Sequence, residues 1–130
     1  MTDARCCEQK DWVGSSRSFW IAWGLPILAL VGAVFATPPL TVVIWVAALG
    51  WMGAACLANA ARCGRRHCYF TGPFYLLLAV VSLLHGLGIV WLGPHGWGWL
   101  GLTVGLGTVL LWWLPERVWG RFTDHGRSAA

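Results

Sequence analysis

Long apolar runs alternate with short polar segments along the whole chain, and this alternation is the strongest pattern in the sequence. Four runs, at about 19–36, 39–58, 74–92 and 96–114, contain no Asp, Glu, Lys or Arg. A helix needs about 20 predominantly apolar residues to cross the hydrocarbon core of a bilayer. The pattern therefore predicts an all-α membrane protein, a four-transmembrane-helix bundle in which residues 1–130 form a single membrane domain.

The composition agrees with this interpretation. Hydrophobic residues make up 58% of the 130 residues and charged residues 11%, whereas soluble domains carry about 25% charged residues. The first run also resembles the apolar part of a cleaved signal peptide. Its length, its internal Pro26 and the three acidic residues before it favour a retained span instead, and Pro26 predicts a kink in that span.

The positive charges follow the apolar runs in a way that predicts orientation. All nine Lys and Arg residues lie before the first run, between the second and third runs, or after the fourth run. These three segments share one side of a four-span protein, and the positive-inside rule makes that side cytoplasmic. We therefore predict a multi-pass protein of the cell (inner) membrane with cytoplasmic tails at 1–18 and 115–130.

The same distribution bears on partners. The basic residues build no basic face, so nucleic acid is excluded as a partner. Arg62, Arg65 and Arg66, between the second and third runs, are predicted to bind anionic lipid headgroups of the bilayer. A further helix is predicted after Pro115, lying along the membrane surface, with a frayed tail as the alternative.

Small residues recur along each run at helical spacing, which is typical of helices that pack closely in lipid. The clearest stripe is Gly98, Gly101, Gly105 and Thr108 in the fourth run. These stripes predict a compact bundle and leave open a homo-oligomer or a larger membrane complex. The stripes of the other runs are Ala29, Gly32 and Ala36; Ala47, Gly50 and Ala54; and Ala79, Ser82 and Gly86.

The segment between the second and third runs reads as a helix end, a turn and a new helix start. Gly64 is a typical helix stop, and Arg65 and Arg66 would form the turn. Thr71 is placed to cap the third span, with Pro73 in its first turn.

Most of the candidate chemistry lies in this segment. Cys63 and Cys68, with His67 beside the latter, supply two thiolates and an imidazole, which are ligands for soft ions such as copper, zinc or mercury. Cys56 and Asn59 share a helical face with Cys63 if the second span continues as helix that far. The chain has five cysteines, and the remaining two, Cys6 and Cys7, precede the first run. Reducing cytosol on the predicted side favours free thiols over disulfides.

His85 is the one ionisable residue inside an apolar run, near the middle of the third. Its functional interpretation is a ligand or a proton relay. The alternative is a neutral histidine bonded to a backbone carbonyl, to Thr103 or to Thr108. No catalytic residues or organic cofactor site are indicated, and the sequence favours a non-enzymatic role.

The stretch "NAARCGRRHCYFTGPF" resembles a segment of small prokaryotic four-span membrane proteins of uncharacterised function. More loosely, the chain is similar to the small bacterial mercuric-ion transport proteins. That resemblance implies transfer of a thiophilic ion between cysteine pairs, although the first span here lacks the cysteine pair of that family.

These observations give one leading functional hypothesis and two alternatives. The leading hypothesis is a membrane protein that binds or transports a soft metal ion. In it, Cys63, His67 and Cys68 bind the ion, Cys56 extends the site into the bundle, and the Cys6–Cys7 pair exchanges ligands with the site. The alternatives are an accessory protein packed on a larger membrane complex and a membrane thiol-redox protein, although the latter lacks the usual C-x-x-C spacing.

Overall fold

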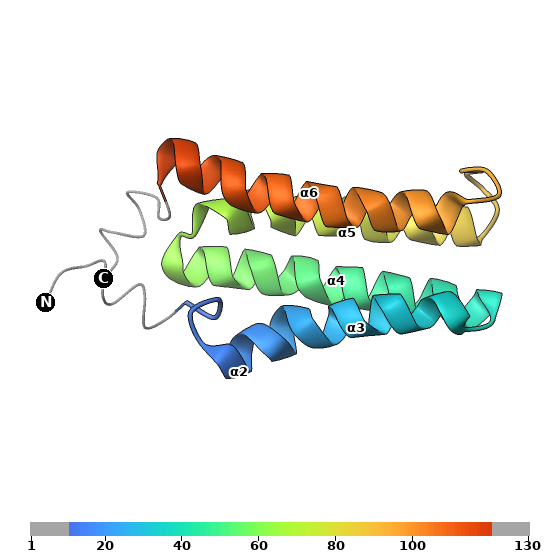
Figure 1. Ribbon diagram of the computed structural model, residues 1–130, viewed down its shortest axis with the longest axis horizontal. Coiled ribbons are helices and arrows are strands. Elements are labelled where there is room, and N and C mark those ends of the chain that lie inside the picture. The colour runs from blue at the N-terminus through green and yellow to red at the C-terminus, as the bar shows by residue number, and fades with distance from the viewer. Residues whose placement is uncertain (1–10, 121–130) are drawn as a thin grey trace, which may run out of the picture.

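The computed structural model describes residues 11–120, and these are helical almost throughout (Figure 1). Among the described residues there is no strand. The elements are α2 (Ser16–Phe19), a π-helical turn (Trp20–Gly24), α3 (Leu25–Gly32), a 3-10 turn (Ala33–Phe35), α4 (Pro38–Cys63), α5 (Arg66–Gly86) and α6 (Gly96–Trp119).

Four helical segments are long and apolar enough to cross a membrane, which confirms the predicted all-α, four-span fold. The first is the continuous rod Ser16–Phe35. Pro26 lies in the first turn of α3, directly after the π-helical turn. A proline has no N–H to bond the preceding turn, so the helix changes geometry at the position where the sequence predicted a kink.

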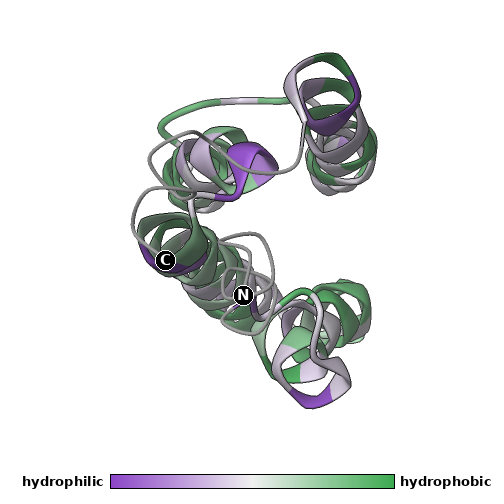
Figure 2. Cartoon of the chain, turned by 90° about the vertical axis from the view of Figure 1, so that its left-hand side faces the viewer, coloured by the Kyte–Doolittle hydropathy of each residue, from purple (hydrophilic) through white to green (hydrophobic). Residues whose placement is uncertain are grey.

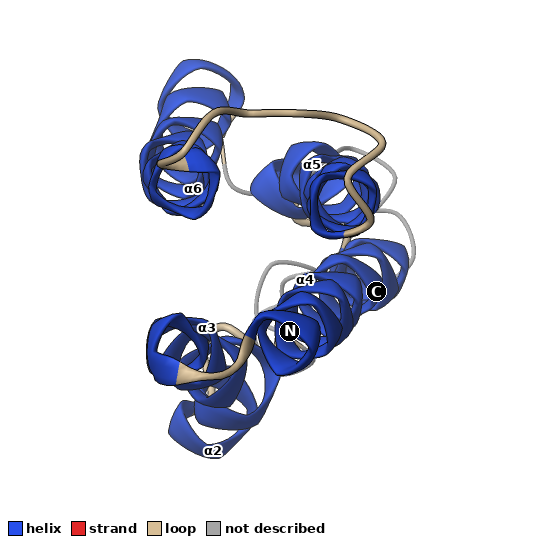
Figure 3. Cartoon of the chain, turned by 90° about the vertical axis from the view of Figure 1, so that its right-hand side faces the viewer, coloured by secondary structure: helices blue, strands red, loops and turns tan. Residues whose placement is uncertain are grey.

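The four spans form an open arc rather than a closed, compact bundle. α4 packs against α5, α6 packs against α5, and α3 packs against α4. Figures 2 and 3 show α3 and α6 at the two ends of this arc. An apolar groove of about 460 Å³ lies between α3 and α6, with Trp45 and Met52 of α4 among its lining residues.

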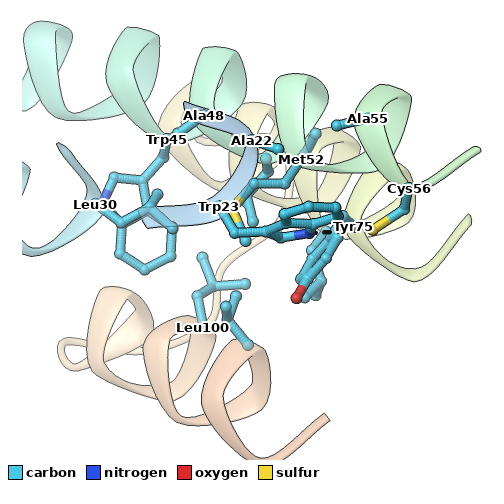
Figure 4. Packing of buried hydrophobic residues seen from close by; sticks show 14 of the residues in the cluster. Ala22, Trp23, Leu30, Trp45, Ala48, Met52, Ala55, Cys56, Tyr75 and Leu100 are labelled. Carbon is cyan, nitrogen blue, oxygen red and sulfur yellow. Dashed lines mark hydrogen bonds between the residues drawn. The ribbon is translucent and has the colours of Figure 1, made fainter. Parts of the chain in front are cut away.

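α4 and α5 approach each other closely at the glycines Gly53 and Gly72. A Cβ added to Gly53 would lie 2.8 Å from Leu76 Cγ and 3.0 Å from the carbonyl oxygen of Gly72. Only a residue without a side chain fits this crossing, since real Cβ atoms do not come so near. Larger buried side chains, including Trp23, Trp45, Met52 and Tyr75, fill the space beside it (Figure 4).

Most of the predicted small-residue faces do not form helix contacts. Ala79 and Ser82 of α5 are buried, as predicted. Ala47 and Ala54 of α4 are exposed, and α4 packs against its neighbours through the adjacent face instead. Ala29 and Gly32 are exposed as well, whereas Gly98 and Gly105 line the groove between α3 and α6, where an added Cβ would meet nothing within 4 Å. In a membrane both faces of a helix are apolar, so small residues alone do not identify the packed face.

The connection between α4 and α5 is shorter than predicted. Gly64 ends α4 in the left-handed conformation (φ 64°) and donates its N–H to the Ala60 carbonyl at 2.7 Å, which confirms the helix stop. α5 then begins at Arg66, so Thr71 lies inside the helix and donates to the His67 carbonyl at 2.9 Å instead of capping the span. Pro73 is also inside α5. The turn therefore places His67 in the first turn of α5.

The last two spans end at other residues than predicted, the third earlier and the fourth later. α5 ends at Gly86 instead of residue 92, which leaves His85 in its last turn. α6 continues through Pro115 to Trp119, so the region after 114 does not start a separate surface helix within the described residues. This continuation brings Glu116 onto a membrane-length helix.

The two ends of the described chain and the α4–α5 turn lie at the same end of the molecule (Figure 1). We call this the basic end, because it carries Arg17, Arg62, Arg65, Arg66 and Arg117. Because the number of spans is even, the two ends of the described chain must lie on the same side of the membrane. That the basic end faces the cytoplasm remains a prediction from the charge pattern.

Candidate functional site

A cluster of polar side chains is buried at the basic end of the molecule. It draws on the segment before α2, the end of α4, the turn after it, the start of α5 and the end of α6. We call it the polar cluster; its members are Asp11, Cys56, Asn59, Cys63, Arg65, His67, Cys68 and Glu116.

Arg65 connects two carboxylates from distant parts of the chain. Its Nη1 pairs with Asp11 Oδ2, and its Nε donates to Glu116 Oε1 at 2.8 Å. The side chain of Asp11 is 2% exposed, that of Arg65 10% and that of Glu116 13%. Little water screens these ion pairs, so their mutual attraction is stronger than at a protein surface. The guanidinium faces inward, which does not fit the headgroup contact predicted for Arg65.

His67 lies between a carboxylate and a thiol. Its Nδ1 is 2.5 Å from Glu116 Oε1, and its Nε2 is 3.3 Å from Cys68 Sγ. The imidazole also stacks on Trp112, with ring centroids 5.2 Å apart. A carboxylate on one ring nitrogen orients the other toward its ligand, as in the outer shells of metal sites.

Asn59 joins the thiols to the segment before α2. Its Nδ2 donates to Asp11 Oδ1 at 2.8 Å and approaches Cys68 Sγ at 3.5 Å. Its Oδ1 accepts the Trp12 N–H at 3.1 Å and lies 3.8 Å from Cys63 Sγ. Cys56, Asn59 and Cys63 are all buried on α4, which confirms the common face predicted from their spacing.

Cys56 and Cys68 are buried thiols that form no disulfide, and they lie near enough to interact electrostatically with each other. Two further donors point at Cys56 Sγ: Trp23 Nε1 at 3.3 Å and Thr71 Oγ1 at 3.4 Å. Figure 4 shows the first of these, with the indole of Trp23 reaching from the first span to the thiol. Three membrane-length helical segments thus converge on this pair of sulfur atoms.

The donors do not form a preorganised site for a metal that requires many ligands. Within residues 11–120 no group of three or more His, Cys, Asp or Glu side chains is placed to hold a metal ion. A tetrahedral zinc site needs four ligands, and the described residues do not provide one. Two of the predicted ligands, Cys6 and Cys7, lie outside the described residues.

His85 is far from the polar cluster. It lies at the opposite end of α5, and its Nδ1 is 3.2 Å from the Val90 carbonyl. Its ring meets Trp97 edge-on at 5.2 Å. The prediction of a mid-membrane position is therefore wrong, and the alternative of a backbone carbonyl partner is confirmed. Thr108 bonds Tyr75 at 2.7 Å instead.

Sequence reasoning missed two members of the polar cluster, Asp11 and Glu116. Both were assigned to polar tails. The available signal was charge: the chain has only five acidic residues, and Glu116 lies two positions after the fourth predicted span, while Asp11 lies in the segment before the first. No spacing rule would have paired either with Arg65, because the contacts join residues 54 and 51 positions apart.

No protein-family model, no curated protein and no solved structure matches this chain. The resemblances seen in the sequence therefore stay predictions.

Proposed function

We propose that this membrane protein binds one soft metal ion between the sulfur atoms of Cys56 and Cys68. The observation that supports the proposal is that two buried, neighbouring thiols, neither in a disulfide, are each surrounded by polar donors of the polar cluster. Thiolates select soft ions such as Cu⁺. A pair of sulfur ligands suits an ion that accepts linear, two-coordinate binding, and such an ion does not need a third preorganised donor.

The surroundings of the two sulfur atoms support this choice. Trp23, Thr71 and Asn59 direct N–H and O–H groups at them, and such donors stabilise a deprotonated sulfur. Arg65 adds a positive charge to the polar cluster. His67 Nε2 is the nearest nitrogen ligand, at 3.3 Å from Cys68 Sγ. Cys63 becomes a neighbour of the ion site rather than a first ligand.

A carrier role extends the proposal. The polar cluster lies at the basic end, which the charge pattern assigns to the cytoplasm. Asp11 is held by both Arg65 and Asn59, and Cys7 precedes Asp11 by only a few residues in the sequence. In this proposal Cys6 and Cys7 exchange the ion with the Cys56–Cys68 pair at the cytoplasmic face of the inner membrane.

The test is the stoichiometry of Cu⁺ binding to purified protein in mild detergent. We use a background with Cys6→Ser and Cys7→Ser, so that only the described cysteines contribute. This background should bind one Cu⁺ per chain, and Cys56→Ser or Cys68→Ser should abolish binding. Cys63→Ser is the matched control and should retain it. Unchanged binding in the Cys56→Ser and Cys68→Ser variants would refute the proposal.

The same pair of thiols favours a second function, reversible thiol–disulfide exchange. A disulfide between two neighbouring thiols requires Cα atoms about 4.4–6.8 Å apart, so its formation would also test how near these two residues lie. A small disulfide such as oxidised glutathione would accept the two electrons and two protons and leave as two thiols. Mass spectrometry after incubation with oxidised glutathione tests this function. A Cys56–Cys68 crosslink is expected, and thiols that stay reduced would exclude it.

Headgroup contact completes the proposal. In this proposal Arg62 and Arg66 contact anionic lipid headgroups, whereas Arg65 is occupied by the two carboxylates.

A further inference from the structure

A second cleft lies at the basic end, between the start of α5 and the end of α6, away from the thiols. Its volume is about 420 Å³, and it is lined by Arg66, Tyr69, Phe70 and Trp119. One wall is cationic and the others are aromatic. This combination resembles neither the polar cluster nor the apolar groove between α3 and α6.

Arg66 differs from the neighbouring arginines in how its guanidinium is used. Arg65 pairs with carboxylates, while Arg62 and Arg117 lie over the rings of Trp12 and Trp113 at 4.8 and 5.2 Å. The buried Nε of Arg66 has no hydrogen-bond partner among the described residues. An unsatisfied N–H of this kind is costly, and a phosphate group is a preferred acceptor for a guanidinium.

The aromatic walls are fixed by contacts of their own. Phe70 of α5 and Trp119 of α6 are stacked, with centroids 6.2 Å apart and planes at 18°. Tyr69 donates its hydroxyl to the Ala60 carbonyl at 3.2 Å. All three side chains are still partly exposed, at 43% to 57%. Amphipathic aromatic rings favour the membrane interface, so the cleft offers an apolar surface beside a cation.

The position of the cleft along the membrane normal indicates which kind of phosphate compound can occupy it. α5 begins at Arg66 and has 21 residues, which gives a length of about 31 Å, close to the thickness of the hydrocarbon core. Arg66 therefore lies near the level of the headgroups. A lipid places its phosphate at this level and its acyl chain along the helices, whereas free phosphate would gain nothing from three aromatic walls.

We infer that this cleft is a discrete binding site for one anionic phospholipid, with its phosphate on Arg66 and its upper acyl chain against Phe70 and Trp119. The inference rests on the proposed headgroup contact and is independent of the thiol site. It assigns to Arg66 a discrete phosphate site, which goes beyond the general headgroup contact proposed for Arg62; Arg62 and Arg117 lie over tryptophan rings.

The test is native mass spectrometry of delipidated protein titrated with phosphatidylglycerol or phosphatidylcholine. Wild-type protein should bind one phosphatidylglycerol about tenfold more tightly than phosphatidylcholine, because the choline cation of the latter neutralises the phosphate charge that Arg66 would otherwise attract. Arg66→Gln should lose this preference, and Arg117→Gln, the matched control, should keep it. Trp119→Leu should weaken binding of both lipids, because it removes a shared apolar wall.

Three results would overturn the inference. Equal losses in Arg66→Gln and Arg117→Gln would indicate general surface charge. Equal affinity for the two lipids would exclude recognition of the net anionic charge. Full displacement of phosphatidylglycerol by inorganic phosphate would identify a free-phosphate site. Resistance of Arg66→Gln to unfolding by SDS, followed by circular dichroism, serves as the folding control and needs no Cu⁺, so failure of this site and failure of the thiol site are distinguishable.

Discussion

Replacing Arg65 with methionine is the most informative perturbation of the polar cluster. Methionine keeps most of the length and apolar volume of arginine but removes the charge shared by Asp11 and Glu116. At the 2.8 Å separation of Arg65 Nε and Glu116 Oε1, one pair attracts by about 6 kcal/mol at an effective dielectric constant of about 20. Desolvation offsets part of this attraction, and removal of one partner from a buried pair costs about 3–5 kcal/mol.

The expected loss comes from the carboxylates that remain. Asp11 is 2% exposed and Glu116 is 13% exposed, so neither can recover full hydration without opening the structure. The variant Arg65→Met combined with Asp11→Asn and Glu116→Gln leaves no unpaired charge, and it should regain most of the lost stability. Resistance to unfolding by SDS in mild detergent, followed by circular dichroism, measures both effects. Arg62→Met is the control for loss of a positive charge at the basic end.

Two results would refute this reasoning. A loss below about 1 kcal/mol in Arg65→Met would mean that the pairs behave like solvent-screened surface salt bridges. A triple variant as unstable as Arg65→Met would mean that the guanidinium stabilises the fold through something other than its carboxylate partners.

Three further predictions concern the close helix crossing and the surroundings of the thiols. Gly53→Ala should destabilise the fold by about 1–3 kcal/mol, because its Cβ meets Gly72 and Leu76; Gly50→Ala, which meets nothing within 4 Å, should be neutral or stabilising in the same SDS assay. Glu116→Gln should leave Cu⁺ affinity nearly unchanged in competition with a Cu⁺ chelator, because Glu116 holds His67, which is not a ligand of the two-sulfur site; a loss of about 10–100-fold would indicate that His67 binds the ion. Trp23→Phe should weaken binding by about tenfold in that competition, because it removes one hydrogen bond to sulfur; wild-type affinity would contradict that role.

The sequence predicted the spans well because their signal is local. Each apolar run is long enough to identify a helix, and Gly64 identified the end of α4. The start of α5 was missed because Arg66, His67 and Thr71 are polar residues inside a helix. His67 and Thr71 are buried there and bonded to Glu116, Cys56 and the backbone, so tertiary contacts replace the water that a polar helix end would otherwise need.

The candidate site was predictable only within a single helix. Helical periodicity correctly placed Cys56 and Asn59 on the same face as Cys63. The proximity of Cys56 and Cys68 depends instead on how α4 crosses α5 at Gly53. No pattern along the chain encodes that crossing, because lipid-facing and protein-facing residues are equally apolar.

X-ray absorption at the copper edge of Cu⁺-loaded protein tests the central claim most directly. In the background with Cys6→Ser and Cys7→Ser, the account predicts two sulfur ligands from Cys56 and Cys68, with an unchanged spectrum after Cys63→Ser. Three or four ligands in this background, or a two-sulfur spectrum that persists after Cys68→Ser, would contradict it.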